Sequence, residues 1–222
     1  MAGLKFKEVT PEVKARLDLG DAVIAQVKRL APWGSGNQKH VVEKTHGRSA
    51  YLTGLVQRRL GDDDWERPLR NAGVTAGYGA GACQNLASLS YTVLRSRLSA
   101  ADTICLCAHL EVTHWCATIG DPDQDPANEV VVVDPWPISP QACVLEDHFC
   151  GDALEVVRRK HAGKPNLARR LRKHKPPDGQ TKRAYARRNW FTYDFNEYPS
   201  DWWNQVYCSK YDCRVIYQTR MP

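Results

Sequence analysis

The chain has 222 residues and a formal net charge of +6 at pH 7, and 42% of its residues are hydrophobic. This length fits a single domain, and the hydrophobic content with seven tryptophans predicts a packed core and excludes a disordered chain. No apolar run approaches the roughly 20 residues of a membrane span, and the N-terminal residues lack the apolar region of a signal peptide. We therefore expect a protein that is cytoplasmic in its producer, and that leaves it only through a dedicated secretion system or as part of a longer protein.

The first third of the chain is predicted to be helical. Apolar residues recur at helical spacing over Val9–Ala31, and a Thr-Pro pair supplies an N-cap and a first helical residue. Residues 32–36 break this helix, and a second one is predicted over Val41–Leu60. His40 and His46 are interpreted as surface histidines, because no acid or nucleophile surrounds them in the sequence.

Cys83 is the candidate nucleophile. The three glycines of Gly77–Ala82 predict a tight turn, and apolar residues at helical spacing follow Cys83. A thiol at a helix N-terminus faces unpaired N–H groups and the positive end of the helix dipole, and both favour the reactive thiolate. The stretch Trp65–Ala76 is predicted to wall the adjacent cleft.

His114 and Asp134 are the candidate base and orienting acid. The segments Val112–Ile119 and Glu129–Val133 have strand composition, and a polar loop joins them. If these strands form an antiparallel hairpin with Ile119 opposite Glu129, His114 lies opposite Asp134 and the two side chains share a face. An aspartate there would fix the imidazole tautomer and stabilise the imidazolium.

Each of these three residues also has a purely structural interpretation. Cys83 fits a small core residue, His114 a half-buried strand histidine, and Asp134 a cap of the turn that follows it. Their joint arrangement favours catalysis.

A helix is predicted from about Ala142 to Lys160, with Glu146, Asp147 and His148 on its solvated face. Arg158–Arg188 has 13 basic residues and one acidic residue, so it carries +12 and the rest of the chain carries −6. This segment is predicted to be a helix with a mobile loop.

The basic segment is either a solvated surface or a binding surface for an acidic protein or an anionic surface. Nucleic acid is disfavoured, because the segment has a single aromatic residue for base stacking. The residues proposed for this surface are Arg158, Arg159, Lys160, Arg169, Arg170, Arg172 and Lys173.

The chain is predicted to end in strands, Trp190–Tyr193 and Gln205–Thr219, that complete the sheet around the His114 hairpin. The eight cysteines include no Cys-x-x-Cys pair, so we expect reduced, buried thiols and no bound metal. No phosphate-binding glycine loop or HExxH motif is present, and no cofactor is expected.

The motifs GAC before an apolar helix, THW in a strand and VVVDPWP resemble the core of papain-like and transglutaminase-like cysteine enzymes. They are most similar to the protein-glutamine deamidase domains of bacterial toxins and injected effectors. The resemblance covers about sixty residues of the 222. It implies an α+β fold with a papain-like core, in which the nucleophile helix packs on an antiparallel sheet and Cys83, His114 and Asp134 form the catalytic triad.

The resemblance implies one domain over residues 1–222: a helical part (1–70), a catalytic core (77–137), a basic insertion (158–188) and C-terminal strands (190–222). It further implies a protein-glutamine deamidase or transglutaminase acting on a protein substrate as an effector or toxin. The alternatives are a papain-like protease and, in another class, a basic module that binds nucleic acid or an anionic surface. No glutamine precedes Cys83 where papain-type peptidases keep an oxyanion donor. The candidate oxyanion and cleft residues are therefore Tyr78, Gly79, Trp115 and Trp136.

Overall fold

The protein has a mixed helix and strand fold, described here from a computed structural model. The structure describes residues 5–61, 66–109, 111, 113–171, 213 and 215–220. The helices are α1 (Pro11–Leu30), α2 (Lys39–Lys44), α3 (Arg48–Leu60), α4 (Pro68–Tyr78), α5 (Cys83–Arg97), α6 (Asn166–Leu171) and the short 3-10 helix η2 (Leu145–Asp147). The strands are β1 (Lys5–Val9), β2 (Gly34–Ser35), β3 (Ala80–Gly81), β4 (Thr103–His109), β5 (His114–Ile119), β6 (Val131–Val133), β7 (Cys143–Val144), β8 (Glu155–His161) and β9 (Val215–Thr219).

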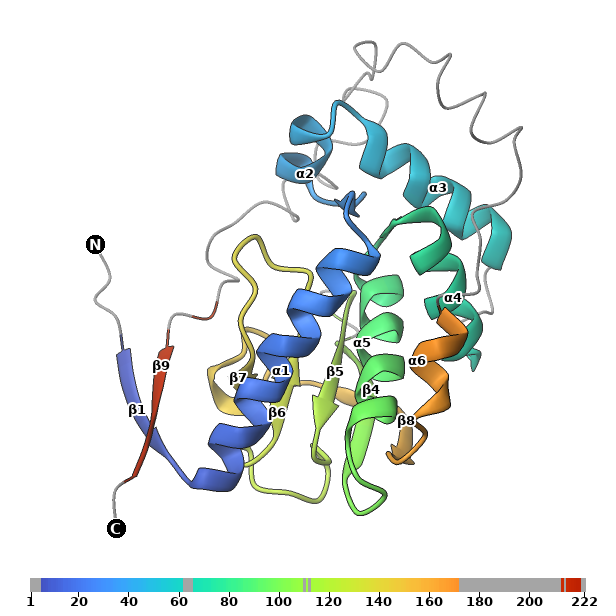
Figure 1. Cartoon of the computed structure of the whole chain (residues 1–222). Helices are drawn as coiled ribbons and strands as arrows, with labels where there is room; N and C mark the ends of the chain where they lie inside the picture. The colour runs from blue at the N-terminus through green and yellow to red at the C-terminus, as the bar shows by residue number, and fades with distance from the viewer. Residues whose placement is uncertain are drawn as a thin grey trace.

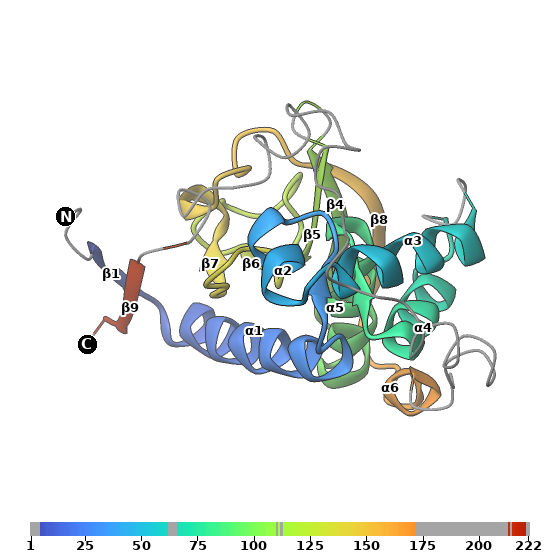
Figure 2. The same cartoon turned by 90° about the horizontal axis from the view of Figure 1, so that it is seen from above.

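A five-stranded antiparallel sheet in the order β7-β6-β5-β4-β8 forms the centre of the fold. Helix α5 packs against β5 and β4, and α1 packs against β6 and α5. Figure 1 shows these two helices side by side across one face of the sheet, and Figure 2 shows the same layer from above. The prediction of an α+β fold with the Cys83 helix on an antiparallel sheet agrees with this arrangement.

The predicted first helix is confirmed as α1. The Thr10 side chain accepts a hydrogen bond from the Val13 N–H at 3.3 Å, which satisfies one of the unpaired donors at the helix start. Gly20 lies inside this helix because a side chain would not fit there: an added Cβ would lie 2.6 Å from the Cβ of Ala142. The glycine therefore allows α1 to approach the sheet closely.

The predicted helix over Val41–Leu60 is two helices, α2 and α3, so the single-helix prediction is wrong. His46 and Gly47 have φ angles of 51° and 80° and break the helical path between them. A positive φ is accessible to glycine at little cost, whereas it is uncommon for histidine. The local sequence His46-Gly47 thus marks a helix boundary that periodicity alone did not reveal.

The predicted turn over Gly77–Ala82 is only partly correct, because α4 continues to Tyr78. Gly79 then ends α4 in the left-handed conformation, with φ 76°. The short strand β3 pairs with β2, which follows α1, and leads to the start of α5. This pairing holds the N-terminal helical part next to the segment that carries Cys83.

The predicted register of the β5–β6 hairpin is wrong by two residues. Ile119 pairs with Val131 and not with Glu129, because Glu129 belongs to the connecting loop, where its N–H donates to Pro126 O at 2.8 Å. Side chains alternate along a strand with a period of two, so a shift of two residues leaves His114 and Asp134 on the same face.

The predicted helix over Ala142–Lys160 is wrong. The chain forms β7, then η2, and then the edge strand β8, which pairs with β4. The β-branched pair Val156-Val157 favours a strand, and the unpaired edge of β4 supplies its hydrogen-bond partners. The predicted basic helix and loop therefore begin as a strand of the central sheet.

The prediction for the C-terminal strands is also wrong in its placement. β9 pairs in parallel with β1 in a separate two-stranded sheet, which Figure 1 shows beside the central one. Tyr217 connects the two sheets: its hydroxyl donates to Asp147 Oδ2 at 2.9 Å and accepts from the Val144 N–H at 3.2 Å. The strand predicted at Trp190–Tyr193 lies outside the described residues.

The cysteines that the structure describes are free thiols, and all of them except Cys213 are buried. This agrees with the prediction of reduced, buried cysteines. Among the described helices, none combines the length and the apolar character needed to cross a membrane.

Candidate active site

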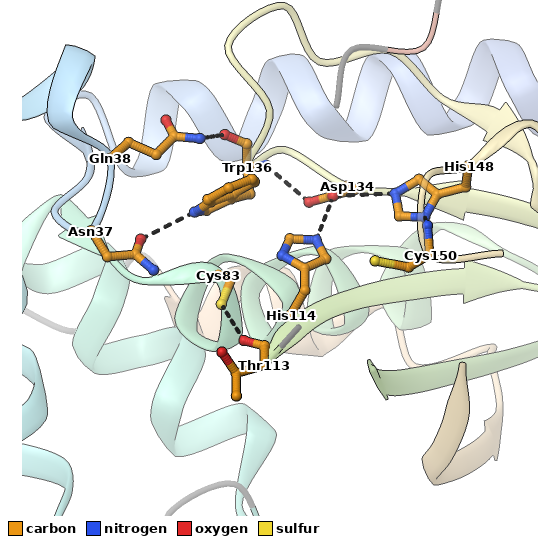
Figure 3. A network of polar contacts seen from close by, with 9 residues as sticks. All are labelled: Asn37, Gln38, Cys83, Thr113, His114, Asp134, Trp136, His148 and Cys150. Atoms are coloured by element: carbon orange, nitrogen blue, oxygen red, sulfur yellow. Dashed lines mark hydrogen bonds and ion pairs between the residues drawn. The ribbon is translucent and has the colours of Figure 1, made fainter. Parts of the chain in front are cut away.

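Cys83 is the first residue of α5, and its side chain is buried. The Asn85 side chain accepts a hydrogen bond from the Ala82 N–H at 2.9 Å and so fixes the entry into the helix. N–H groups in the first turn of a helix have no intrahelical acceptor and form the positive end of the helix dipole. The Cys83 thiol donates to Thr113 O at 3.6 Å, which places it beside the start of β5 (Figure 3).

His114 and Asp134 form a buried pair beside this thiol. His114 Nε2 lies 2.7 Å from Asp134 Oδ2, and the exposed fractions of the two residues are 4% and 2%. Thr113, directly before His114, has a φ of 47°, which is strained for a β-branched residue. Because Nε2 bonds to the carboxylate, Nδ1 is the imidazole nitrogen left to accept a proton.

The electrostatics of the pair favour its charged form. Burial by itself lowers the pKa of His114, but the Asp134 carboxylate and the neighbouring Cys83 side chain raise that pKa to about 10. Burial also acts to raise the pKa of Asp134, but the His114 imidazolium holds that pKa well below its ordinary value. The pair is therefore an imidazolium and a carboxylate at neutral pH.

His148 is a third member of the site, which the sequence analysis placed on a solvated helix face. It is buried, and its Nε2 lies 3.3 Å from Asp134 Oδ2. The Cys150 N–H donates to His148 Nδ1 at 3.3 Å, so Nδ1 is an acceptor and the ring proton is on Nε2. Burial lowers the pKa of His148, which keeps it neutral. His148 thus donates to Asp134 without adding a charge.

Asp134 is consequently held by three donors. Two are the histidine Nε2–H groups on Oδ2, and the third is the Trp136 N–H, which donates to Oδ1 at 3.0 Å. The signal for His148 in the sequence is the apolar run Cys143–Leu145 just before it, which indicates a buried extended segment. The sequence analysis missed it because it assigned this region to a helix.

Trp136, one of the predicted cleft residues, lies beside His114. Its ring lies 4.9 Å from the His114 ring between centroids, and its Nε1–H donates to Asn37 Oδ1 at 3.0 Å. Gln38 is buried and donates to Trp136 O. Asn37 and Gln38 were not predicted, because they lie between α1 and α2 and only the tertiary fold brings them to Trp136 (Figure 3).

The other predicted cleft residues are Tyr78, Gly79 and Trp115. Tyr78 ends α4, and Gly79 donates its N–H to Thr75 O at 2.8 Å, so this N–H is already used within the helix cap. Gly79 is therefore not an oxyanion donor here. Trp115 follows His114 directly in β5, so strand alternation directs it to the opposite face of the sheet.

The predicted basic surface is divided among different environments. Arg158, Arg159 and Lys160 lie in β8, and Arg159 forms ion pairs with Asp121 and with Asp123, the latter at 2.7 Å. Its charge is thus already neutralised by the loop between β5 and β6. Arg169 and Arg170 belong to α6. Arg172 and Lys173 lie outside the described residues.

His114, Asp134 and His148 are also the one set of side chains, among the described residues, whose spacing could hold a metal ion. Two histidines and a carboxylate are ligands typical of zinc. Both Nε2 atoms, however, already bond to the same carboxylate oxygen. A metal ion would have to replace these hydrogen bonds.

No family model, curated protein or solved structure matches this chain.

Proposed function

We propose that this protein is a cysteine-dependent acyl-transfer enzyme with a papain-like core and a catalytic triad of Cys83, His114 and Asp134. The observation that carries the proposal is the buried His114–Asp134 pair at 2.7 Å, next to a thiol at the start of a helix. An imidazolium beside a thiol favours the thiolate, which is the nucleophilic form. Asp134 orients the imidazole so that Nδ1 is available to the Cys83 sulfur and to the leaving group.

The reaction follows from these roles. The His114 imidazolium carries its second proton on Nδ1, and the Cys83 thiolate that it stabilises attacks a carbonyl carbon of the substrate to form a tetrahedral intermediate. The leaving amine departs with the proton from His114, and a thioester remains on Cys83. The neutral His114 then removes a proton from water or from a second amine, which attacks the thioester and releases the product and the Cys83 thiolate.

Asn37 is the side chain that we assign to the oxyanion. Its Oδ1 accepts hydrogen bonds from the Trp136 indole and from the Ser35 hydroxyl, so the amide nitrogen is directed elsewhere. Figure 3 shows that nitrogen on the side of Asn37 that faces Cys83. The Asn37 amide and the backbone N–H of Cys83 would together stabilise the developing negative charge on the substrate oxygen.

The substrate class rests on the resemblance of the GAC, THW and VVVDPWP motifs, which favours the carboxamide of a glutamine in a protein. Ammonia is then the leaving group, with water as acceptor for a deamidase or an amine for a transglutaminase. A protease would use the same triad with a peptide amine as leaving group. Host or competitor proteins reached by secretion are the proposed targets.

The test is alkylation of the reduced protein by limiting iodoacetamide at about pH 6, followed by peptide mapping of each cysteine. Cys213 is an internal reference, because hydrogen bonds with neighbouring groups, the Cys143 thiol first among them, lower its pKa to about 7 independently of His114. We expect His114→Ala to reduce the rate at Cys83 by at least about tenfold and to leave Cys213 unchanged. Conversion of glutamine to glutamate in unfolded casein, lost in Cys83→Ala, would then identify the leaving group.

New labelling at thiols that are buried in the folded protein, such as Cys107 and Cys116, would indicate general unfolding, and the rate at Cys83 should then be compared in His114→Gln. A Cys83 rate that does not respond to either His114 variant would refute the triad. Peptide-bond cleavage in casein without any glutamine conversion would keep the triad and assign a protease.

A further inference from the structure

A cleft of about 450 Å³ lies where α4, α5 and α6 pack on one another beside β8 (Figure 1). None of the triad residues lines it. Tyr91, in its wall, belongs to the same helix as Cys83 and lies about 12 Å further along the axis, at about 1.5 Å per residue. The volume is within the range of about 300–1,000 Å³ that is typical of small-molecule sites.

The lining of this cleft is basic. Among the described residues that line it, four are arginines (Arg67, Arg70, Arg95 and Arg158) and one, Glu66, is acidic. Arg70 already donates a hydrogen bond to the backbone of α3. Arg95 and Arg158 are partly exposed, and neither takes part in an ion pair with another described residue. Cations gathered in one concavity raise the local concentration of anions.

Tyr91 and Arg95 bring unsatisfied donors to this cleft. Tyr91 is 1% exposed and its hydroxyl has no hydrogen-bond partner, and the same holds for the buried Nε–H of Arg95. The Arg95 guanidinium lies 5.7 Å from the centre of the Tyr91 ring. Burial raises the pKa of Tyr91 to about 12, while the charges of Arg95 and Arg158 act to lower it, so the hydroxyl keeps its proton at neutral pH. A buried donor without a partner is costly unless a ligand accepts from it.

The start of α4 lies in the same cleft. Pro68 is the first residue of this helix, and both Pro68 and Leu69 line the cleft. The side chain of the N-cap residue Arg67 makes no capping hydrogen bond, and the first turn contains no acidic residue. N–H groups in the first turn of a helix have no intrahelical acceptor, and together with the helix dipole they favour an anion. The helix start and the Tyr91–Arg95 pair thus both suit an anionic acceptor in one place.

We propose that this cleft binds a small phosphate monoester, with its phosphate on the start of α4, Tyr91, Arg95 and Arg158, and its organic group against Leu69 and Leu167. Arginine suits phosphate because its guanidinium donates paired hydrogen bonds to two phosphate oxygens. The cleft is larger than a phosphate ion, so it has room for the organic group next to its leucines. The site does not use the Cys83 thiol and does not depend on the proposed enzyme activity.

The test is isothermal titration calorimetry of the full chain at physiological ionic strength, with phenyl phosphate, inorganic phosphate and phenol as probes. We expect phenyl phosphate to bind, inorganic phosphate to bind more weakly and phenol not to bind. Tyr91→Phe removes only the hydroxyl and should weaken the binding of phenyl phosphate by about tenfold, because a hydrogen bond to a charged acceptor is lost.

The role of Arg95 is tested with a matched control on the same helix. Arg95→Gln should weaken the binding of phenyl phosphate by at least about tenfold, because a charge-assisted hydrogen bond is lost. Arg97→Gln removes the same charge from α5 outside the cleft and should change the affinity by less than about twofold.

A second readout separates binding from folding. Tyr91→Phe removes an unsatisfied buried hydroxyl, so the free variant should melt at a temperature at least as high as that of the wild type. The further rise in melting temperature that phenyl phosphate causes should be smaller in this variant. If Tyr91→Phe does not fold, Arg158→Gln takes its place. Cys83→Ala should bind phenyl phosphate like the wild type, so a failure of the proposed enzyme activity does not affect this result.

Equal weakening by Arg95→Gln and Arg97→Gln would show a general charge effect and overturn the proposal. Binding of phenol as tight as that of phenyl phosphate would overturn it as well, because the phosphate would then contribute nothing. An equal affinity for inorganic phosphate would overturn the assignment of an ester. The absence of heat with either phosphate up to millimolar concentration would overturn the site as a whole.

Discussion

Replacing Asp134 with asparagine should flatten the pH dependence of stability between pH 6.5 and 8. In the folded protein the pKa of His114 is about 10, whereas its ordinary value is 6.5. The folded state therefore keeps a proton that the unfolded chain releases as the pH rises through 6.5. The stability from this proton is fully present below pH 6.5 and is lost as the pH rises toward 10.

The size of the effect follows from these two pKa values. One proton of difference changes the free energy of unfolding by about 1.4 kcal/mol per pH unit, so the wild type should lose about 2 kcal/mol from this source between pH 6.5 and 8. Without the carboxylate, burial lowers the pKa of His114 below 6.5 and this loss disappears. The variant should also be less stable at pH 6.5 by about 3–5 kcal/mol, because a buried charge pair is broken.

The measurement is urea denaturation in reducing buffer at four pH values from 6.5 to 8. The series stops at pH 8 because of the buried thiols. Burial raises the pKa of thiols such as Cys107 and Cys116 in the folded protein, so above pH 8 their ionisation in the unfolded chain would add a further loss of stability. Asp21→Asn is the matched control. Burial raises the pKa of the Asp21 carboxyl, but this carboxyl is not among the groups that shift the pKa of His114, so the variant should keep the wild-type slope.

A wild-type unfolding free energy that stays constant from pH 6.5 to 8 would refute the charged His114–Asp134 pair. If Asp134→Asn keeps the wild-type dependence of the unfolding free energy on pH, Asp134 is not the cause of the raised pKa of His114. If that variant does not fold, His114→Gln should show the same flat profile.

Two further predictions concern the support of the site and the packing of α1. His148→Ala should lower the unfolding free energy at pH 7 by about 1–3 kcal/mol, because the Asp134 carboxylate loses a donor, and His148→Gln should restore most of it in urea denaturation. Because burial lowers the pKa of His148, the wild type should also lose stability as the pH falls below 6.5. If the unfolding free energy of His148→Gln falls as steeply as that of the wild type below pH 6.5, His148 is not the neutral histidine inferred here. Gly20→Ala should destabilise by about 1–3 kcal/mol through overlap with Ala142, whereas Gly54→Ala in α3, where an added Cβ has nothing within 4 Å, should stabilise by about 0.5–1 kcal/mol in thermal melts. If Gly20→Ala and Gly54→Ala change the stability by the same amount, helix propensity and not packing determines the effect of a side chain at position 20.

Local sequence determined the elements whose residues carry their own start and stop signals. The Thr-Pro pair before α1 and the glycines before α5 specify helix starts through backbone chemistry that acts within a few residues. The order of Cys83, His114 and Asp134 along a helix and two strands was likewise visible, because strand alternation tolerates the register error of two residues. These features depend on neighbours in the chain and not on packing.

Tertiary structure alone decided the remainder of the site. His148 reaches Asp134 because β7 adds to the edge of β6, and this pairing turns a predicted helix into an extended segment. Asn37 and Trp136 are 99 residues apart in the sequence and meet only in the folded chain. The ion pairs of Arg159 were equally non-local, because Asp121 and Asp123 lie in the loop between β5 and β6. Periodicity records which face of an element is apolar, but it does not record which distant element covers that face.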